Sequence, residues 1–189
     1  KKVNIVCHSK GGLDSRHYVE SADNVANVIQ IGTPNGGSPL ADFIQRASLS
    51  ALGILPTVLI NLFAGPAGVQ LTTPHMTFYN LMHGSNGNVR YTALAGMYDA
   101  GCFALNPFCR PLDRLLLSIS GSPGDTIVPK WSVHALGYTG KPSYSSSGVD
   151  GSAKHSPLIQ SLAVFNQLQG RVTANRRTLQ TSSVPEPEY

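Results

Sequence analysis

The first part of the chain alternates between strand and helix patterns, and this order constrains the fold more than any other feature. Val3–Cys7 is an apolar run that predicts a buried strand, and Asn27–Ile31 predicts a second one. The intervening Leu13–Ala22 is typical of a helix. A strand, a helix and a strand in so short a segment form a βαβ unit, whose two strands lie parallel in one sheet. The predicted fold class is therefore α/β, a mostly parallel sheet flanked by helices.

Further elements follow along the chain. Val89–Leu94 predicts a third strand, and Thr73-Pro74 opens a helix that continues through His75–Met82. The segment 112–119 fits a helix or a strand equally well, whereas 138–150 is rich in serine and glycine and predicts a loop. Apolar spacing predicts helices over four more segments: 38–50, 54–63, 130–136 and 156–168. One domain is expected over residues 1–170, followed by a polar, flexible tail over 171–189.

Composition excludes several classes of function. The 189 residues fit one domain, and 41% of them are hydrophobic, which is enough for a core. Only 13% are charged, with a net charge of +4 and no dense basic tract, so nucleic acid is not expected as a partner. The longest apolar stretch, Ala51–Ala64, is interrupted by glycine, proline and polar residues and is too short to span a bilayer.

A serine lies where the first strand turns into the first helix, within Cys7-His8-Ser9-Lys10-Gly11-Gly12. Small residues around such a turn allow the sharp backbone bend that exposes a nucleophilic serine at the tip of the strand. The helix N-terminus favours the negative charge that develops during acyl transfer, and the backbone N–H of Lys10 is the expected oxyanion donor. Cys7 departs from the usual pattern, which has glycine there. The sequence therefore predicts Ser9 as a nucleophile.

A serine hydroxyl needs a histidine base that a carboxylate orients, and after such a turn the order along the chain is serine, acid, histidine. Asp125 lies in the turn-forming segment 121–129, just before an apolar pair, and is the predicted acid. His155 immediately precedes the last predicted helix and is the predicted base. Asp99, which follows the third predicted strand, stays an alternative acid. The remaining aspartates have weaker settings: Asp14 and Asp42 are expected to be solvated on helices, and Asp113 and Asp150 have no comparable turn.

The other histidines fit the role of base less well. His8 adjoins the serine, but at a strand end its side chain is expected to point away from it and to pack. His134 is expected to face its own helix. Surface or core positions without a special role are expected for the rest: His17, His75 and His83.

Three cysteines bear on the compartment and on metal binding. Cys102 and Cys109 bracket a short loop, and a disulfide between them would indicate a secreted or periplasmic protein; the alternative is two free thiols. No histidine or second cysteine pair has ligand spacing near them, so no metal site is predicted. Cys7 lies in an apolar run and is expected to be a small core residue.

Three segments together resemble bacterial secreted triacylglycerol lipases of the α/β-hydrolase fold. They are Val3–Arg16 around the serine, Ile31-Gly32-Thr33-Pro34-Asn35-Gly36-Gly37-Ser38, and Leu71-Thr72-Thr73 with Tyr79-Asn80. The similarity is good over Val3–Asn80 and thin afterwards. The resemblance implies a carboxylic-ester hydrolase with Ser9 as nucleophile, Asp125 as acid and His155 as base, and no cofactor. Pro157 stands where these lipases often have a calcium-binding aspartate, so the calcium site is not carried over.

The resemblance also implies that this chain is the C-terminal part of a larger hydrolase. In the family the nucleophile strand is about the fifth of the sheet, so the fold is expected to be incomplete without the N-terminal strands. Those strands would cover an apolar edge and supply the second oxyanion donor. The expected partner is this N-terminal segment, either as a separate chain or simply not included in this sequence.

An apolar insertion over about residues 46–72 occupies the position of a lipase lid. Its candidate lid residues are Leu52, Ile54, Leu55, Leu59 and Phe63. A lid covers the serine with its apolar face and opens on a membrane or other lipid surface. The alternative is an ordinary buried helix or a subunit contact.

The predicted function is hydrolysis of lipid or other apolar esters through an acyl-enzyme. Three alternatives remain open at this point: an acyltransferase, a polyester depolymerase of the same fold, and a catalytically silent binding subunit.

Overall fold

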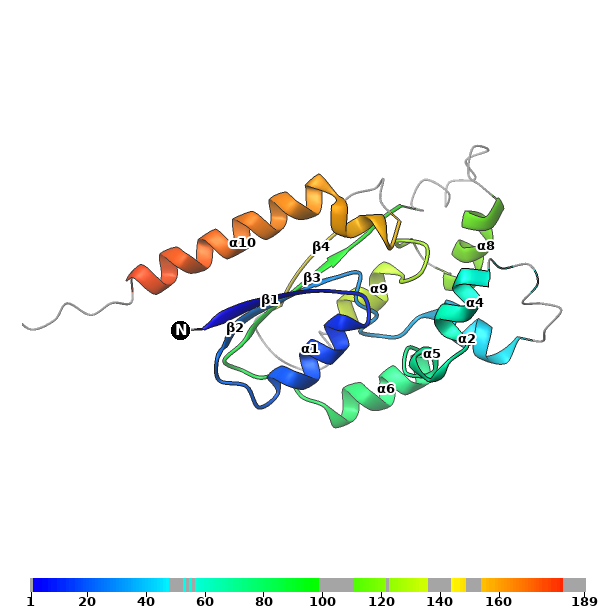
Figure 1. The fold of residues 1–189 in the computed structure, drawn as a ribbon, viewed down its shortest axis with the longest axis horizontal. Coiled ribbons are helices and arrows are strands. Elements are labelled where there is room, and N and C mark those ends of the chain that lie inside the picture. The colour runs from blue at the N-terminus through cyan, green and yellow to red at the C-terminus, as the bar shows by residue number, and fades with distance from the viewer. Residues whose placement is uncertain are drawn as a thin grey trace, which may run out of the picture.

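The computed structural model describes residues 2–47, 53, 55, 57–98, 111–121, 123–135, 144–148 and 154–181. Its centre is a four-stranded sheet in the order β1 (Val3–His8), β2 (Val25–Ile31), β3 (Arg90–Ala95) and β4 (Tyr144–Gly148). Every neighbouring pair is parallel, and residues Val6, Ile29 and Thr92 stand side by side across the first three strands (Figure 1). The predicted parallel sheet of an α/β fold is confirmed.

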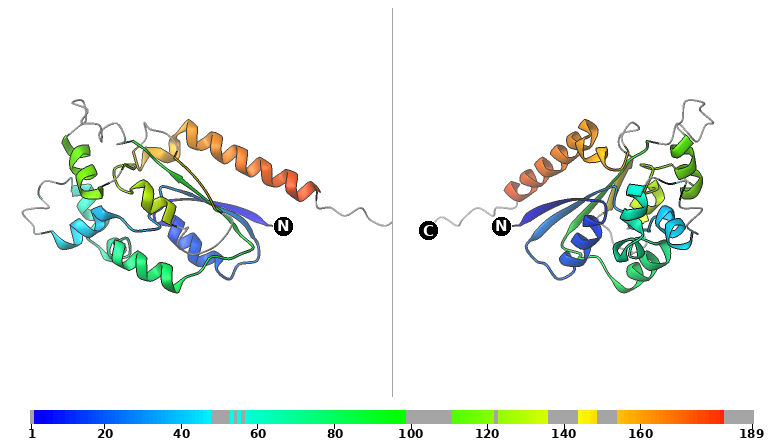
Figure 2. Two further views of the ribbon diagram at one scale, coloured as in Figure 1. Left: turned by 180° about the vertical axis from the view of Figure 1, so that it is seen from behind. Right: turned by 45° about the vertical axis from the view of Figure 1, so that its right-hand side comes forward.

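The two inner strands β2 and β3 are apolar because both faces of the sheet are covered. On one face, Ile29, Ile31 and Leu94 pack against Leu158 and Val164 of the C-terminal segment. Those last two residues belong to the 3₁₀ helix η2 (Pro157–Gln160) and to α10 (Leu162–Thr181). Figure 2 shows α10 lying along one side of the sheet.

The opposite face carries two helices, α1 (Gly11–Val19) and α9 (Lys130–Val133). Val19 of α1 is fully buried with Val28 of β2, and Val133 of α9 is fully buried with Ala93 of β3. Because successive side chains of a strand point to opposite faces, alternate residues of β2 and β3 pack against α10 on one side and against α1 and α9 on the other.

The remaining helices gather at one end of the sheet (Figure 1). They are α2 (Pro39–Arg46), α4 (Thr57–Phe63), α5 (Pro66–Val69), α6 (Thr73–Met82) and α8 (Pro111–Ser120). Leu40 of α2, Phe63 of α4, Met76 of α6 and Leu116 of α8 share one apolar core, to which α1 adds Leu13. This cluster fixes the helices that follow the serine turn.

Several candidate lid residues belong to this same core. Leu55 and Phe63 are 5% and 1% exposed, and Leu59 packs against the cluster from its edge. Leu52 and Ile54 lie outside the described residues. The three described candidates are therefore packed inward, whereas Leu62 and Val69 of the same insertion are 51% and 46% exposed. Movement of the segment as a lid stays a prediction.

The structure corrects one predicted element, resolves an ambiguous one and extends a third. The segment 138–150 was expected to be a loop, but its Tyr144–Gly148 forms β4. The reason is tertiary: β3 has backbone groups on its outer side that need partners, and Tyr144–Gly148 pairs with Tyr91–Ala95. The ambiguous segment 112–119 is helical, as part of α8, and α10 extends past residue 170 to Thr181.

In the part of the chain that the structure describes, no helix is both long enough and apolar enough to cross a membrane.

Candidate active site

Ser9 forms the tip of the turn between β1 and α1. Its φ of +52° lies in the left-handed region, which costs a non-glycine residue about 1–2 kcal/mol. Two backbone hydrogen bonds hold this conformation: Ser9 N donates to the Ile31 carbonyl oxygen (3.0 Å), and Gly12 N donates to the Ser9 carbonyl oxygen (3.0 Å). The turn therefore has the strained strand-to-helix geometry of a nucleophile elbow.

Gly12 is required by the close approach of α1 to the segment after β2. A Cβ on Gly12 would lie only 2.0 Å from Oγ1 of Thr33, which is itself fully buried. At Gly11 a Cβ would meet nothing within 4 Å. Gly12, rather than Gly11, is therefore the glycine that lets α1 pack closely against Thr33.

Ser9, His155 and Asp125 converge at the turn from three distant segments of the chain. The Ser9 hydroxyl lies 2.8 Å from Nε2 of His155, and Nδ1 of His155 lies 2.7 Å from Oδ2 of Asp125. The Asp125 carboxylate accepts hydrogen bonds, so Nδ1 carries the proton and Nε2 is left to accept from the serine hydroxyl. Asp125 is fully buried and His155 is 4% exposed, so water screens this chain of contacts weakly.

The turn that carries Asp125 holds its carboxylate in place. Oδ1 accepts hydrogen bonds from the backbone N–H groups of Ile127 (3.1 Å) and Val128 (2.8 Å), which leaves Oδ2 for the histidine. The backbone N–H of His155 donates to the carbonyl oxygen of Asp125 (2.9 Å). The two predicted residues are therefore tied together by backbone as well as by side chain.

Gly32 is a site residue that was not among the predicted ones; in the sequence it stands out only as part of the segment 31–38. It has a φ of +56°, and a Cβ there would lie 2.9 Å from Oδ2 of Asp125 and 3.2 Å from Nδ1 of His155. The only sequence signal for this role is a glycine directly after a buried strand. The side chains that occupy the space of its missing Cβ, Asp125 and His155, come from distant parts of the chain.

His8 is a second residue whose role was missed. Its side chain was expected only to pack, but its Nε2 donates a hydrogen bond to the carbonyl oxygen of His155 (2.9 Å), and the two rings lie 4.7 Å apart. Burial and the nearby His155 lower the pKa of His8. The lowered pKa favours the neutral imidazole, and through its hydrogen bond His8 braces the backbone of His155.

Asp113 anchors the His155 segment from the other side. It lies on α8, is 1% exposed, and accepts from Nζ of Lys154 (2.7 Å) and from the hydroxyl of Tyr98 (3.2 Å). Lys154 immediately precedes His155, so the ion pair ties the histidine segment to α8. Asp113 thus has a structural partner of its own, and it is not in contact with the imidazole.

A buried polar network explains two of the motifs found in the sequence. Arg16 of α1 is 2% exposed and donates to Oδ1 of Asn35 (3.2 Å) and to Oδ1 of Asn80 (2.9 Å). Asn35 in turn donates to Oε1 of Gln30 (2.9 Å). The network joins β2, the segment after it, α1 and α6. Burial lowers the pKa of Arg16, and side-chain oxygens take the place of a carboxylate partner.

The remaining candidates are placed as follows. Asp14 is exposed, as expected, and pairs with Nζ of Lys10 (2.6 Å). Asp42 is not solvated as expected: it is half-buried and accepts from N (2.8 Å) and Oγ1 of Thr73, because it caps the start of α6. Four other candidates lie outside the described residues: Asp99, Asp150, Cys102 and Cys109.

Comparisons with known proteins bear on this geometry. No protein-family model matches the chain. It is 29% identical over 136 residues to triacylglycerol lipase 2 of Saccharomyces cerevisiae, which covers 67% of this chain and 38% of that protein. It is 39% identical over 77 residues to a triacylglycerol lipase of Burkholderia plantarii, which covers 40% of this chain and 22% of that protein. The chain therefore spans well under half the length of these relatives.

Two solved lipase structures have a similar fold. The mature form of Bacillus licheniformis lipase BlEst2 matches with a TM-score of 0.61 and 22% identity, over 90% of this chain and 65% of that one. Staphylococcus hyicus lipase matches with a TM-score of 0.62 and 14% identity, over 97% of this chain and 72% of that one. The chain thus has the α/β-hydrolase fold, and over the matched segments its sequence is similar to proteins named triacylglycerol lipases.

Proposed function

We propose that the protein hydrolyses carboxylic esters of lipids or other apolar acyl compounds, with Ser9 as nucleophile, His155 as base and Asp125 as the orienting acid. One observation carries this proposal: the continuous contact from the Ser9 hydroxyl through both nitrogens of His155 to the Asp125 carboxylate, at 2.8 Å and 2.7 Å. The similarity to triacylglycerol lipases supports an ester as the substrate.

The first half of the reaction forms an acyl-enzyme. Ser9 Oγ attacks the ester carbonyl carbon while Nε2 of His155 takes the hydroxyl proton. Asp125 stabilises the imidazolium that results and keeps Nδ1 protonated. His155 then gives its proton to the departing alcohol oxygen as the ester C–O bond breaks, which leaves the acyl group on Ser9.

The second half repeats these steps with water. His155 removes a proton from a water molecule, the hydroxyl oxygen attacks the acyl carbon, and Ser9 leaves with the proton from His155. An acyltransferase would use another alcohol at this point. Adding a primary alcohol during turnover therefore separates the two activities, because a hydrolase releases mainly the free acid.

The oxyanion of both steps needs backbone donors. Lys10 follows Ser9, and none of the described residues accepts a hydrogen bond from its backbone N–H. A second donor from a preceding part of the protein would complete the hole, and losing one donor typically lowers turnover by about 10²–10³.

The exposed edge of β1 supports such a preceding part as the partner of this chain. Val3 and Val6 of this strand are 50% and 49% exposed, and among the described strands β1 pairs only with β2. A long apolar edge strand is a site for further pairing. A further parallel strand on β1 would cover this edge and bring the second oxyanion donor close to Ser9.

Acid release measured at constant pH from an emulsified triacylglycerol tests the proposal in the full-length protein. We expect Ser9→Ala to abolish the release and Asp125→Asn to lower it by about 10⁴, because the wrong histidine tautomer is then favoured. Ser118→Ala, at an exposed serine of α8, is the matched control and should leave the rate unchanged. Equal rates for Ser9→Ala and the unmodified protein would refute the proposal.

Comparing rates below and above the substrate concentration at which droplets form tests the lid. A lid over about residues 46–72 predicts a jump in rate when the droplets appear. A smooth saturation curve would mean that Leu55, Leu59 and Phe63 are ordinary core residues.

A further inference from the structure

The last turn of α1 and the end of α6 bring two histidines and a glutamate together, outside the site described above. His17 and Glu20 are three residues apart on α1 and its cap, so they lie on the same helix face. His83 caps the C-terminus of α6. Each histidine is isolated in the sequence and was expected at a surface or core position without a special role; the two lie 66 residues apart in the chain.

The potential ligand atoms are already close to one another. Nδ1 of His83 lies 3.0 Å from Oε1 of Glu20, and Nδ1 of His17 lies 3.9 Å from Oε2. One nitrogen or oxygen atom from each residue lies within 4.8 Å of the other two. Oε1 of Glu20 is buried and accepts no hydrogen bond of good geometry from the described residues. Nδ1 of His83 contacts both carboxylate oxygens, Oε1 at 3.0 Å and Oε2 at 3.2 Å, and a bound ion would take the place of this contact.

Neighbouring side chains hold this cluster in position. The His83 ring stacks on Tyr79 with 4.3 Å between the centroids, and it meets His17 edge-on at 5.1 Å. Tyr79 is itself fixed, because Arg16 lies over its ring and its hydroxyl donates to the Leu13 carbonyl oxygen. Two of the three potential ligands are half-buried, and His17 is the exposed and adjustable one.

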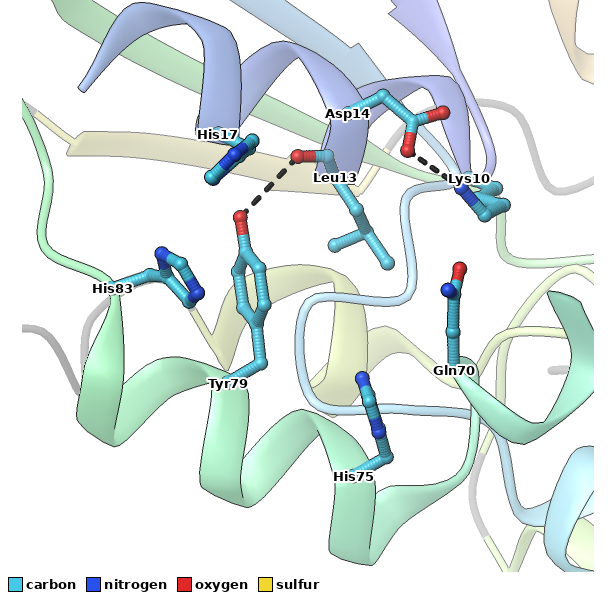
Figure 3. Close-up of a pocket in the computed structure, with 8 residues that line it drawn as sticks. All are labelled: Lys10, Leu13, Asp14, His17, Gln70, His75, Tyr79 and His83. Atoms are coloured by element: carbon cyan, nitrogen blue, oxygen red, sulfur yellow. Dashed lines mark hydrogen bonds and ion pairs between the residues drawn. The ribbon is translucent and has the colours of Figure 1, made fainter. Parts of the chain in front are cut away.

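Two residues of the cluster, His17 and His83, line a cavity of about 320 Å³ between α1 and α6. Figure 3 shows His17, His83 and Tyr79 converging at one end of this cavity, with His75 and Gln70 farther along it. The cavity provides an entry route for an ion and space for a water molecule as a further ligand.

We propose that His17, Glu20 and His83 bind one divalent transition-metal ion, with Zn²⁺ as the preferred species and water in the fourth position. Two imidazole nitrogens and one carboxylate oxygen are a common zinc ligand set, whereas Ca²⁺ selects oxygen ligands only. Metal–ligand distances of about 2.0–2.1 Å need ligand atoms roughly 3.4 Å apart, so only His17 has to move inward appreciably.

The bound ion ties the nucleophile helix to α6. His17 is eight residues along the chain from Ser9, about 12 Å at the helical rise, so the ion does not touch the reacting atoms. Its effect is on stability: binding to the folded state alone raises the melting temperature. This inference is independent of the proposed ester hydrolysis and stands or falls separately from it.

Calorimetric titration of the metal-free full-length protein with Zn²⁺ tests the proposal. We expect one ion per chain with a Kd of about 1 μM or lower, no comparable heat with Ca²⁺, and weaker binding at acid pH, where protons compete for imidazole. His83→Ala and Glu20→Gln should each weaken binding by at least about 100-fold. His75→Ala, which lines the same cavity outside the cluster, is the matched control and should bind normally.

Two further readouts make the outcome decisive. Melting temperatures of the metal-free variants show whether each one folds. Adding Zn²⁺ should raise the melting temperature only when all three residues of the cluster are present. Co²⁺ in place of Zn²⁺ should give the visible absorption of a four-coordinate site. Absent binding, binding that survives in the His17→Ala/His83→Ala double variant, or equal weakening by His75→Ala would each overturn the proposal.

Discussion

At the scale of single residues, the candidate site depends on positions where a side chain must be absent as much as on those that carry chemistry. The contact from Ser9 through His155 to Asp125 passes beside Gly32, where there is no room for a Cβ. His8 then braces the histidine backbone from the strand that carries the serine. Neither Gly32 nor His8 would take part in bond making, yet both position the imidazole.

Gly32→Ala tests this crowding. The new Cβ would approach Oδ2 of Asp125 to 2.9 Å, and the alanine would have to keep the strained positive φ of Gly32. We therefore expect turnover to fall by tenfold or more. Gly121→Ala is the matched control, because Gly121 has a φ of +66° but a Cβ there would meet nothing within 4 Å. Both variants should lose about 1–2 kcal/mol of stability from backbone strain, but only Gly32→Ala should lose turnover. Equal turnover in the two variants would contradict the crowding argument.

His8 makes a prediction about pH. Because burial and His155 lower its pKa in the folded protein, the unfolded chain binds the proton more readily. Stability should therefore fall as the pH decreases below about 6.5, the ordinary histidine value, and level off below the folded pKa. His8→Gln should reduce this loss, measured as the free energy of unfolding in urea between pH 7 and pH 5. If the free energy of unfolding falls by the same amount between pH 7 and pH 5 in His8→Gln, His8 does not contribute to the pH dependence of stability.

Cys7 should be unreactive in the folded protein. Burial raises the pKa of its thiol to about 11, so the thiolate fraction at pH 8 is about 100-fold or more below that of an ordinary cysteine. Alkylation with iodoacetamide, followed by peptide mass spectrometry, should label Cys7 only after unfolding. Rapid labelling of Cys7 in the native protein would contradict its burial.

At the scale of elements, sequence patterns located the sheet better than its outer strand. The apolar runs in β1, β2 and β3 marked buried strands correctly, because inner parallel strands are covered on both faces. β4 was missed because its Tyr-Ser-Ser-Ser-Gly sequence has no strand pattern of its own and pairs only through the backbone of β3. α8 was ambiguous from its spacing, and its packing in the helical core decided it.

The candidate site shows the same limit on prediction. Ser9, Asp125 and His155 could be named because their turns and their order along the chain are local signals. The residues that support them could not be named from sequence, because their contacts join distant parts of the chain. Lys154 contacts Asp113, 41 residues away in the sequence, and His8 contacts His155, 147 residues away. Such pairings are visible only when the elements are placed in space.

The link between α8 and the His155 segment can be tested by removing its charge. Lys154→Gln leaves the 1% exposed Asp113 with the Tyr98 hydroxyl as its main partner, so we expect a loss of about 1–3 kcal/mol in stability. Turnover should fall as well, because the segment carrying His155 is loosened. Lys130→Gln, at an exposed lysine on α9, should change neither quantity. A full retention of stability in Lys154→Gln would show that the ion pair does not anchor the segment.

At the scale of the whole molecule, the described sheet is open at β1, and the chain spans only part of the lipases that it resembles. The helices beyond the sheet and the buried Arg16 network nevertheless fix the serine turn from one side. We therefore expect full activity only when a further strand on β1 brings a second oxyanion donor beside Lys10.

The central claim is that Ser9 is an activated nucleophile, and covalent labelling tests it most directly. A fluorophosphonate reacts with a serine only when a neighbouring base has activated its hydroxyl. In the full-length protein we predict a single adduct on Ser9, identified by peptide mass spectrometry, with no labelling of Ser9→Ala and strongly slowed labelling of Asp125→Asn. An unlabelled Ser9 in correctly folded protein, or the same labelling in Ser9→Ala, would contradict the account.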